Sequence, residues 1–375
     1  MSLETGASIQ ESELGRPKIE DYKRKIEITG SPDEYPSVEI SEVTKKIFPD
    51  FIDSIEKAGE SEGPIIVAVV RCWNKDEKSI SEMIDKVDDI KKSLPGLQGV
   101  ILSINYDQDG EVDKKKPKIE NMTENSLVGV IKQRETSVPI LPLRINKYSW
   151  TSGLNVGVAL MNEIAKEKNI NTEKIRMLNM SFDVNVEKEE VEKMKRLADE
   201  QKYVFTVRKT SEDISPFKLN QNQLWEKFKT IMKEPMNSNL FELVYAMRNT
   251  FGLISLKDLV DFGGFNPLCN GQKRLLPGGK NFSIKGMEDS EFYMRLFLDA
   301  FKKGKIKTIR EFKKSLNNQV FYNDPSWQRM GEVNRFKKIS DETDALNKVA
   351  SNLAESITDS GINRIPVEQQ DFRIN

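Results

Sequence analysis

The stretch Ile65-Ile66-Val67-Ala68-Val69-Val70 decides the fold, because it is a continuous apolar run rich in β-branched residues. Runs of this kind are typical of strands that are buried on both faces, and such strands occur in parallel sheets. The next segment, 79–94, carries apolar residues at helical spacing and is followed by Pro95-Gly96, which ends a helix. The order strand, helix, turn is the first unit of an α/β domain.

The same alternation continues along the chain. Alternating strands and helices predict a doubly wound, mostly parallel sheet with helices on both faces. Before this pattern, the segment 40–58 has the apolar spacing of a helix that packs on the domain. The expected strands are 99–104, 138–143, 175–180 and 203–207, and the expected helices are 153–166 and 187–200.

Changes in composition divide the chain into three parts. Residues 1–62 are rich in Glu, Lys, Ser and Pro, so we expect a flexible start followed by a helix. Residues 63–312 hold the α/β domain, in which 208–249 is a polar helical insertion and 266–285 a long mobile loop. Residues 313–375 are expected to form a C-terminal helical extension and a tail.

The composition excludes several classes of enzyme. The chain has 375 residues and 0 histidines, which removes the commonest general base, the commonest transition-metal ligand and every Ser-His or Cys-His nucleophile pair. Its 2 cysteines, Cys72 and Cys269, are too few for a disulfide framework or, without histidine, for a structural zinc site. Any bound metal must therefore be held by oxygen ligands, which favours Mg²⁺ or Mn²⁺.

Charge and hydropathy bear on partners and location. The 58 Lys and Arg residues and the 59 Asp and Glu residues give a net charge of -1, which argues against nucleic acid as a partner. The sequence has no run of about 18 apolar residues, so we expect no transmembrane segment. The N-terminus lacks the cationic and then apolar pattern of a signal peptide, and we expect a cytoplasmic protein.

Two common phosphate-binding motifs do not fit the sequence. Neither a Walker-type loop at Gly279-Lys280 nor a dinucleotide fingerprint at 152–157 has the required spacing, so neither a nucleoside triphosphate nor a dinucleotide cofactor is favoured.

The first acidic candidate for chemistry is Asp183. Asp183 follows a predicted strand, at the end where open α/β sheets bind ligands, and its carboxylate can hold a divalent cation against a diphosphate. The alternative is that Asp183 only caps the helix that follows.

The second acidic candidate is the pair Glu288-Asp289, which begins a helix directly after the loop at 266–285. A carboxylate in this place can take a proton from an attacking hydroxyl, a role that must be filled here without histidine. The alternative is structural, because acidic residues favour the positive end of a helix.

Four segments of the chain occur in a recognisable order. The first is Val67-Ala68-Val69-Val70-Arg71-Cys72-Trp73-Asn74, and the second is Gly153-Leu154-Asn155-Val156-Gly157. The third is Ser181-Phe182-Asp183, and the fourth runs from Leu256 through Gly263-Gly264-Phe265 to Glu288-Asp289 and Arg295-Leu296. Together they resemble the family-2-like glycosyltransferases with the GT-A fold, which have an opening strand with a polar turn, an Arg-Asn-x-Gly helix, an Asp-x-Asp motif and a Gly-Gly-Phe turn before an acidic pair. The resemblance covers about 64–309.

The resemblance implies a GT-A-type, Rossmann-like nucleotide-diphospho-sugar transferase with N- and C-terminal helical extensions. It implies a UDP- or GDP-sugar donor, Mn²⁺ or Mg²⁺ on Asp183, and a glycan or other hydroxyl acceptor. It also implies that Asp289, beside Glu288, deprotonates the acceptor, so that direct attack inverts the anomeric carbon. The implied donor-binding positions are Asn74, Asn105, Asp107, Asn155, Ser181, Asp183, Gly263 and Gly264.

The chain departs from the family pattern at several positions. Ser181 stands where the family has the first motif aspartate, which removes one charge from the metal site and weakens metal binding. Leu154 replaces the arginine of the Arg-Asn-x-Gly helix, and Arg71-Cys72 stands where the family often has Pro-Thr. Basic residues of the loop at 266–285 could replace part of the cation by contacting phosphates directly, or could simply be solvated. These are Lys273, Arg274 and Lys280.

Two other functions stay open from the sequence. A catalytically degenerate relative could bind a nucleotide-sugar or a glycan without turnover, and Ser181 motivates this alternative. A sugar nucleotidyltransferase would share the sheet type, but such enzymes have a Gly-rich loop after the first strand. The segment Arg71-Cys72-Trp73-Asn74 lacks these glycines.

Overall fold

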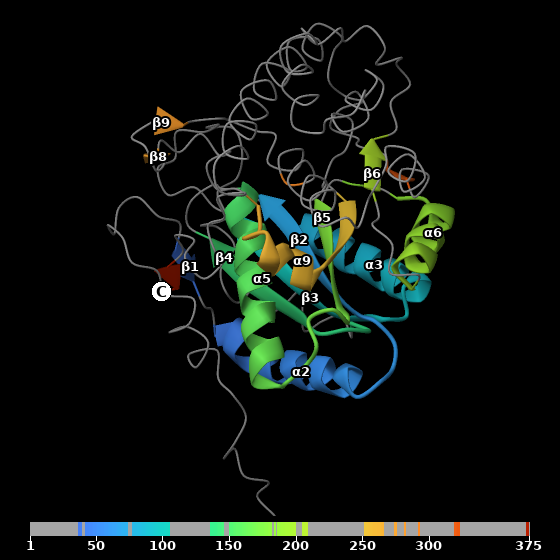
Figure 1. The fold of residues 1–375 in the computed structure, drawn as a ribbon, viewed down its shortest axis with the longest axis horizontal. Coiled ribbons are helices and arrows are strands. Elements are labelled where there is room, and N and C mark those ends of the chain that lie inside the picture. The colour runs from blue at the N-terminus through green and yellow to red at the C-terminus, as the bar shows by residue number, and fades with distance from the viewer. Residues whose placement is uncertain are drawn as a thin grey trace, which may run out of the picture.

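The structure is a computed structural model, and it describes the central part of an α/β domain together with several short outlying segments (Figure 1). In the described part, helices cover both faces of one large sheet. The described residues are 37–39, 42–73, 77–105, 136–145, 150–181, 184, 186–199, 205–208, 251–265, 274–275, 281–282, 292, 319–322 and 373–374.

The centre of the sheet is parallel, as the sequence predicts. Four strands run side by side in the order β4, β3, β2, β5, and each is parallel to its neighbour. A fifth strand, β7, is antiparallel to β5 and completes the main body of the sheet. The bounds are β2 Ile65–Trp73, β3 Leu97–Asn105, β4 Ile140–Ile145, β5 Ile175–Ser181 and β7 Phe251–Ser255.

Two short strands extend the sheet beyond β4. Strand β1, Ser37–Glu39, is antiparallel to β4, and β11, Arg373–Ile374, is parallel to β1. The sheet therefore joins the N-terminal and C-terminal regions of the chain at one edge. Strands of 3 and 2 residues are too short to leave a recognisable pattern in the sequence, so this pairing was not predicted.

Other short strands form two separate pairs. Strand β6, Phe205–Arg208, is parallel to β10, Gln319–Tyr322, in a sheet of its own. The expected strand at 203–207 thus exists but does not extend the main sheet, where β7 takes the place beside β5. Strands β8, Arg274–Leu275, and β9, Asn281–Phe282, form an antiparallel pair inside the segment expected to be a loop.

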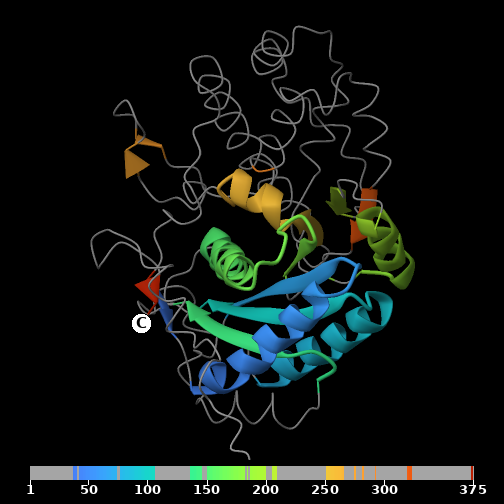
Figure 2. The same ribbon diagram turned by 60° about the horizontal axis from the view of Figure 1, so that its bottom comes forward.

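The helices lie in two layers (Figure 2). Helix α5 covers one face of the sheet, and α2 packs on the same face nearer the amino ends of the strands, with the Phe51 ring over Gly99. Helices α3 and α6 cover the opposite face. The bounds are α2 Glu42–Gly59, α3 Glu77–Ser93, α5 Trp150–Glu167 and α6 Lys188–Asp199.

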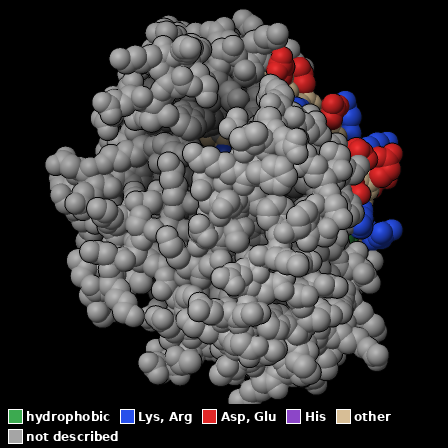
Figure 3. Space-filling view, turned by 90° about the horizontal axis from the view of Figure 1, so that it is seen from above, with side chains coloured by type: hydrophobic (Ala, Val, Ile, Leu, Met, Phe, Trp, Pro, Cys, Tyr) green, Lys and Arg blue, Asp and Glu red, His purple; other side chains and the backbone are tan. Residues whose placement is uncertain are grey.

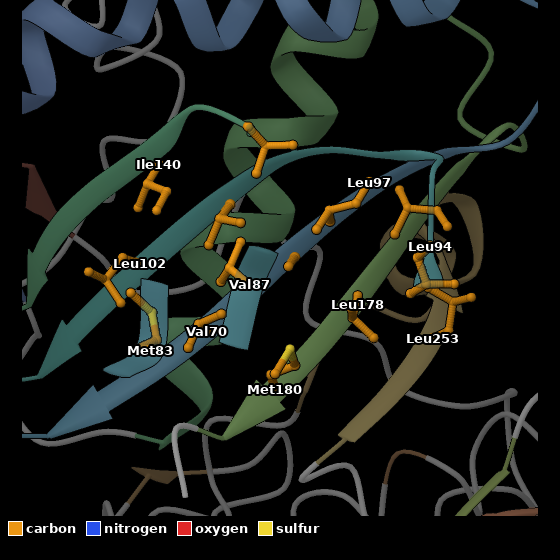
Figure 4. Packing of buried hydrophobic residues seen from close by; sticks show 14 of the residues in the cluster. Val70, Met83, Val87, Leu94, Leu97, Leu102, Ile140, Leu178, Met180 and Leu253 are labelled. Atoms are coloured by element: carbon orange, nitrogen blue, oxygen red, sulfur yellow. The ribbon is translucent and has the colours of Figure 1, made fainter. Parts of the chain in front are cut away.

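Alternating side chains of β2 fill both layers of the core. Ala68 and Val70 belong to the cluster beneath α3 and α6, together with Leu102 and Leu178 of the neighbouring strands (Figure 4). Val69 faces the other way, toward α5. Complete burial of a side chain of this size stabilises a fold by about 1.5–3 kcal/mol, so β2 anchors both layers.

The strand order identifies the end of the sheet where a ligand is expected. The chain moves outward from β2 to β3 and β4 and then returns to the other side of β2 to form β5. The order of strands therefore reverses between β2 and β5, and open α/β sheets bind ligands at the carboxyl ends of the strands at such a point. None of the helices in the described part of the chain is long and apolar enough to cross a bilayer.

Gly99 tests the packing of α2 on the sheet. A Cβ at this position would lie 2.5 Å from Cε2 of Phe51, and the buried ring has little room to move. We expect Gly99→Ala to lower the free energy of unfolding by about 1–3 kcal/mol in urea denaturation. Gly63→Ala is the control, because no atom lies within 4 Å of its Cβ position. Equal stability of the two variants would contradict this packing.

Candidate functional site at the carboxyl edge of β2 and β5

A row of polar residues crosses three strands near the carboxyl edge. Arg71 of β2 is in register with Ser103 of β3 on one side and with Ser181 of β5 on the other. Arg71 is 4% exposed and Ser103 is 0% exposed, so a charged side chain and a hydroxyl are buried on neighbouring strands. Arg71 belongs to β2, the strand next to the point where the strand order reverses. Buried polar groups need partners, and within the described part of the chain the Ser103 hydroxyl has none.

The polar row lies on the face that α5 covers. A Cβ at Gly157 of α5 would lie 2.8 Å from Val69 and 3.6 Å from Ile101. These two residues stand two positions before Arg71 and Ser103 on the same strands, so α5 contacts the sheet just before the polar row. Two residues along a strand span about 6.6 Å, and one turn of helix spans about 5.4 Å, so the two distances are similar. These spacings direct the N-terminal turn of α5 toward Arg71 and Ser103.

The N-terminal end of α5 is positive. The helix is 18 residues long, and its first turn contains no acidic residue. Unpaired backbone N–H groups and the helix dipole give such an end a partial positive charge, which favours anions. In Figure 1 this end of α5 lies beside the arrowhead of β2, the end of the strand nearest Arg71.

A pair of hydrogen bonds joins α5 to a glycine turn that is 110 residues away in the sequence. Asn155 is 0% exposed; its Nδ2 donates to the backbone oxygen of Phe265 at 2.7 Å, and its Oδ1 accepts from the backbone nitrogen of Phe265 at 2.9 Å. Both polar atoms of the side-chain amide are thus hydrogen-bonded to Phe265. Asn155 contributes to the site by positioning this turn.

The glycine turn follows a short helix. Helix α9, Leu256–Asp261, is capped by the Ser255 hydroxyl, which accepts from the Asp258 backbone nitrogen. It lies alongside α5 in Figure 2. Gly263 and Gly264 follow at φ 69° and 67°, in the left-handed region that glycine adopts most easily.

Three phenylalanines pack around this turn. The ring of Phe292 lies 4.8 Å from that of Phe265 and 6.3 Å from that of Phe262, measured between centroids. Phe292 is fully buried and stands three residues after Asp289 in the sequence. This contact packs Phe292 against the residues that flank the two glycines.

The structure describes some of the predicted site residues and not others. Ser181, half-buried at the end of β5, lies beside Arg71, and Gly263 and Gly264 lie beside α5. Asn105 ends β3. The remaining predicted positions fall outside the described residues, or their side chains do: Asn74, Asp107, Asp183, Lys273, Arg274, Lys280, Glu288 and Asp289.

Sequence reasoning did not assign a function to Arg71 or Ser103. Both interrupt an apolar strand pattern, Arg71 directly after 65–70 and Ser103 between Leu102 and Ile104. A polar residue inside a strand that is otherwise buried on both faces is the signal that could have identified them.

The donor atoms near the carboxyl end of β5 suit an oxygen-ligated cation. The Ser181 hydroxyl is an oxygen donor two residues before Asp183, and Mg²⁺ and Mn²⁺ prefer oxygen ligands. Within the described residues, three or more Asp, Glu or Cys side chains do not come together as a metal site. A metal ion here would therefore depend on Asp183, with Ser181 as a neutral partner.

The amino edge of the same sheet carries an arginine in a different setting. Arg176 of β5 is half-buried, and burial lowers its pKa, while Asp258 and Glu173 act in the opposite direction. Its Nη1 donates to the backbone oxygen of Glu173. Arg176 therefore has its own partners, far along β5 from Ser181.

A groove of about 420 Å³ lies between α3 and α6, on the face opposite Asn155. Its lining includes the apolar side chains of Met180 and Val184, and its rim includes Lys92, which forms an ion pair with Asp89 at 2.8 Å. Both partners of this ion pair are exposed, so they differ from the buried arginine of the polar row.

Surface charge on the described part is mixed. Figure 3 shows acidic and basic side chains next to each other at the margin where α6 lies. On that helix Lys188 and Glu192 are 3.9 Å apart. Interspersed charges of this kind do not make a surface for a polyanion.

Comparison with known proteins does not identify a family. The sequence matches no protein-family model, and no curated protein matches it. The structure itself supports an α/β domain with a five-strand, mostly parallel sheet flanked by helices.

Asn155 gives a test of the turn. Asn155→Leu removes both hydrogen bonds and leaves the backbone groups of Phe265 unpaired, so we expect it to lower the free energy of unfolding by about 2–4 kcal/mol. The rate of backbone amide hydrogen exchange at 262–265 should rise in the same variant. Unchanged exchange there would contradict the positioning role.

Asn155→Asp is the matched variant, because protonated aspartic acid can donate to and accept from Phe265 as the amide does. Burial raises the pKa of such a carboxyl in the folded state, so the folded protein binds more protons than the unfolded one and stability falls as pH rises. We expect Asn155→Asp to approach the wild type near pH 4–5 and to lose stability toward pH 7, as measured by urea denaturation.

Proposed function

We propose that the protein is a glycosyltransferase that moves a sugar from a nucleotide-diphosphate donor to a hydroxyl acceptor with the assistance of a divalent metal. The observations that carry the proposal are two contacts that join the described parts of the four family-like segments in pairs. The first and third segments contain Arg71 and Ser181, which are paired on adjacent strands. The second and fourth contain Asn155 and Phe265, which are joined by two hydrogen bonds.

Convergence of this kind supports the proposal because the segments are far apart in the sequence. Any α/β sheet places its strand ends together, so the pairing of Arg71 with Ser181 alone would say little. The contact between Asn155 and Phe265 is more specific, since it joins the two resembling segments that do not belong to neighbouring strands. It places the glycine turn beside the N-terminal half of α5.

In the proposed reaction, the oxygen of the acceptor hydroxyl attacks the anomeric carbon while the carboxylate of Asp289 takes its proton. The bond between the anomeric carbon and the diphosphate oxygen breaks, and direct in-line attack inverts the anomeric centre. A metal ion on Asp183, with Ser181 beside it, would supply positive charge that stabilises the departing diphosphate. Gly263 and Gly264 let the backbone approach the sugar closely.

A binding protein without turnover is the second candidate, and Ser181 is the observation that favours it. Its hydroxyl ends β5 at the position where a second carboxylate would strengthen the metal site. A site with one charged ligand fewer holds a metal ion more weakly. The two candidates share a nucleotide-sugar site and differ in whether Asp289 carries out proton transfer.

Nucleotide binding is tested with a thermal-shift titration of UDP, GDP, CDP and dTDP, each with Mn²⁺, with Mg²⁺ and with EDTA. A ligand that binds only the folded state raises the melting temperature. We expect one nucleotide to give the largest shift, and we expect Asp183→Ala to reduce the part of the shift that depends on metal. If none of the four shifts the melting temperature, the donor site is wrong.

Turnover is tested with Asp289→Asn on the donor that the titration identifies. Because the amide cannot accept the proton, we expect the rate to fall by at least about 100-fold while the dissociation constant of the donor changes little. Glu192→Gln, which changes an exposed carboxylate on α6, is the control and should retain most of the activity. A wild type that binds donor without turnover on any acceptor would favour the binding protein.

A further inference from the structure

We propose that Arg71, Ser103 and the first turn of α5 form an anion site that binds the diphosphate of the ligand directly, without a metal ion. The identity of the ligand rests on the proposed function, but the site itself rests on the described residues. It would make the binding of phosphate groups partly independent of the metal on Asp183.

Arg71 supplies a permanent charge in the right place. The guanidinium keeps its charge at any ordinary pH and can form two parallel hydrogen bonds with phosphate oxygens. Arg71 is 4% exposed and lies two residues before Trp73, the last residue of β2. Two residues of strand span about 6.6 Å, a distance that an arginine side chain can cover. Its charge can therefore act at the carboxyl edge while its backbone stays in the sheet.

Ser103 is the second, independent observation. It is 0% exposed, and its Oγ makes no hydrogen bond within the structure. A buried hydroxyl in this state destabilises the fold, and alanine would fill the position without that loss. The hydroxyl lies directly beside Arg71 in the sheet, on the face that α5 covers. An anion held there would accept its proton in a hydrogen bond.

The first turn of α5 completes the site. Contact of Gly157 with Val69 and Ile101 directs the preceding turn toward Arg71 and Ser103, as described above. The turn carries no acidic residue, so its N–H groups and dipole add to the positive field. A cation and a hydroxyl on neighbouring strands and a helix N-terminus thus come together near the carboxyl edge of β2 and β3.

The site also offsets the departure at Ser181. Loss of one motif carboxylate weakens the hold on a metal ion, and a diphosphate then needs positive charge from another source. Arg71 is the strand neighbour of Ser181, so its charge lies next to the position where the carboxylate is absent. Direct contact with the guanidinium is the simplest replacement.

The test uses inorganic pyrophosphate in the presence of EDTA, with the full chain and isothermal titration calorimetry. We expect the wild type to bind pyrophosphate and Arg71→Gln to bind it roughly 10- to 100-fold more weakly. Arg176→Gln is the matched control, because it removes a partly buried arginine from the amino edge of the same sheet. It should leave the dissociation constant unchanged.

Ser103→Ala tests the site without removing a charge and keeps the proposal testable if Arg71→Gln fails to fold. We expect the ligand-free variant to melt roughly 2 °C or more above the wild type, because an unbonded buried hydroxyl is removed. We also expect it to bind pyrophosphate about 2- to 10-fold more weakly. A purely structural serine would not combine higher stability with weaker binding.

The outcomes separate this proposal from the proposed function. If the wild type does not bind pyrophosphate in EDTA, or if Arg71→Gln and Ser103→Ala bind it as the wild type does, the anion site is overturned. A nucleotide shift with Mn²⁺ would still support the donor site in that case. Pyrophosphate binding that depends on Arg71, without any response to nucleotides, would support the anion site and overturn the nucleotide-sugar donor.

Discussion

The burial of strand β2 on both faces and along both edges is the constraint on which the rest of the structure depends. Its backbone pairs with β3 on one side and β5 on the other over most of its length. Its side chains alternate between the layer under α5 and the layer under α3 and α6. A strand in this position must be apolar almost throughout, because water reaches neither face. A charged residue can therefore stand only near its end, and Arg71 does so.

The sequence predicted most of the elements around β2 because each leaves a local pattern. The apolar run at 65–70, the helical spacing at 79–94 and the run at 175–180 are all visible without tertiary information. Strand β7 was not predicted, since Phe251–Ser255 is short, includes a glycine and has no period-2 pattern. Its pairing with β5 is decided by packing across the sheet. Local propensity has little influence on such a choice.

The candidate site was less predictable than the fold, for a physical reason. The hydrogen bonds between Asn155 and Phe265 were not predicted, because a contact over 110 residues leaves no local pattern. Arg71 and Ser103 each look like a single polar exception in a strand. Only their register shows that they are neighbours. A sequence pattern can point to the segments, whereas only the geometry shows which of their residues are neighbours.

The glycine turn and the polar row belong to one connected set of contacts. Gly157 fixes α5 on Val69, one row below Arg71, and Asn155 on the same helix fixes the backbone of Phe265. Phe265 in turn packs against Phe292. Each step is a buried contact that has little freedom to slip. The position of the turn relative to the backbone of Arg71 is therefore set by α5, so one helix connects the two parts of the candidate site.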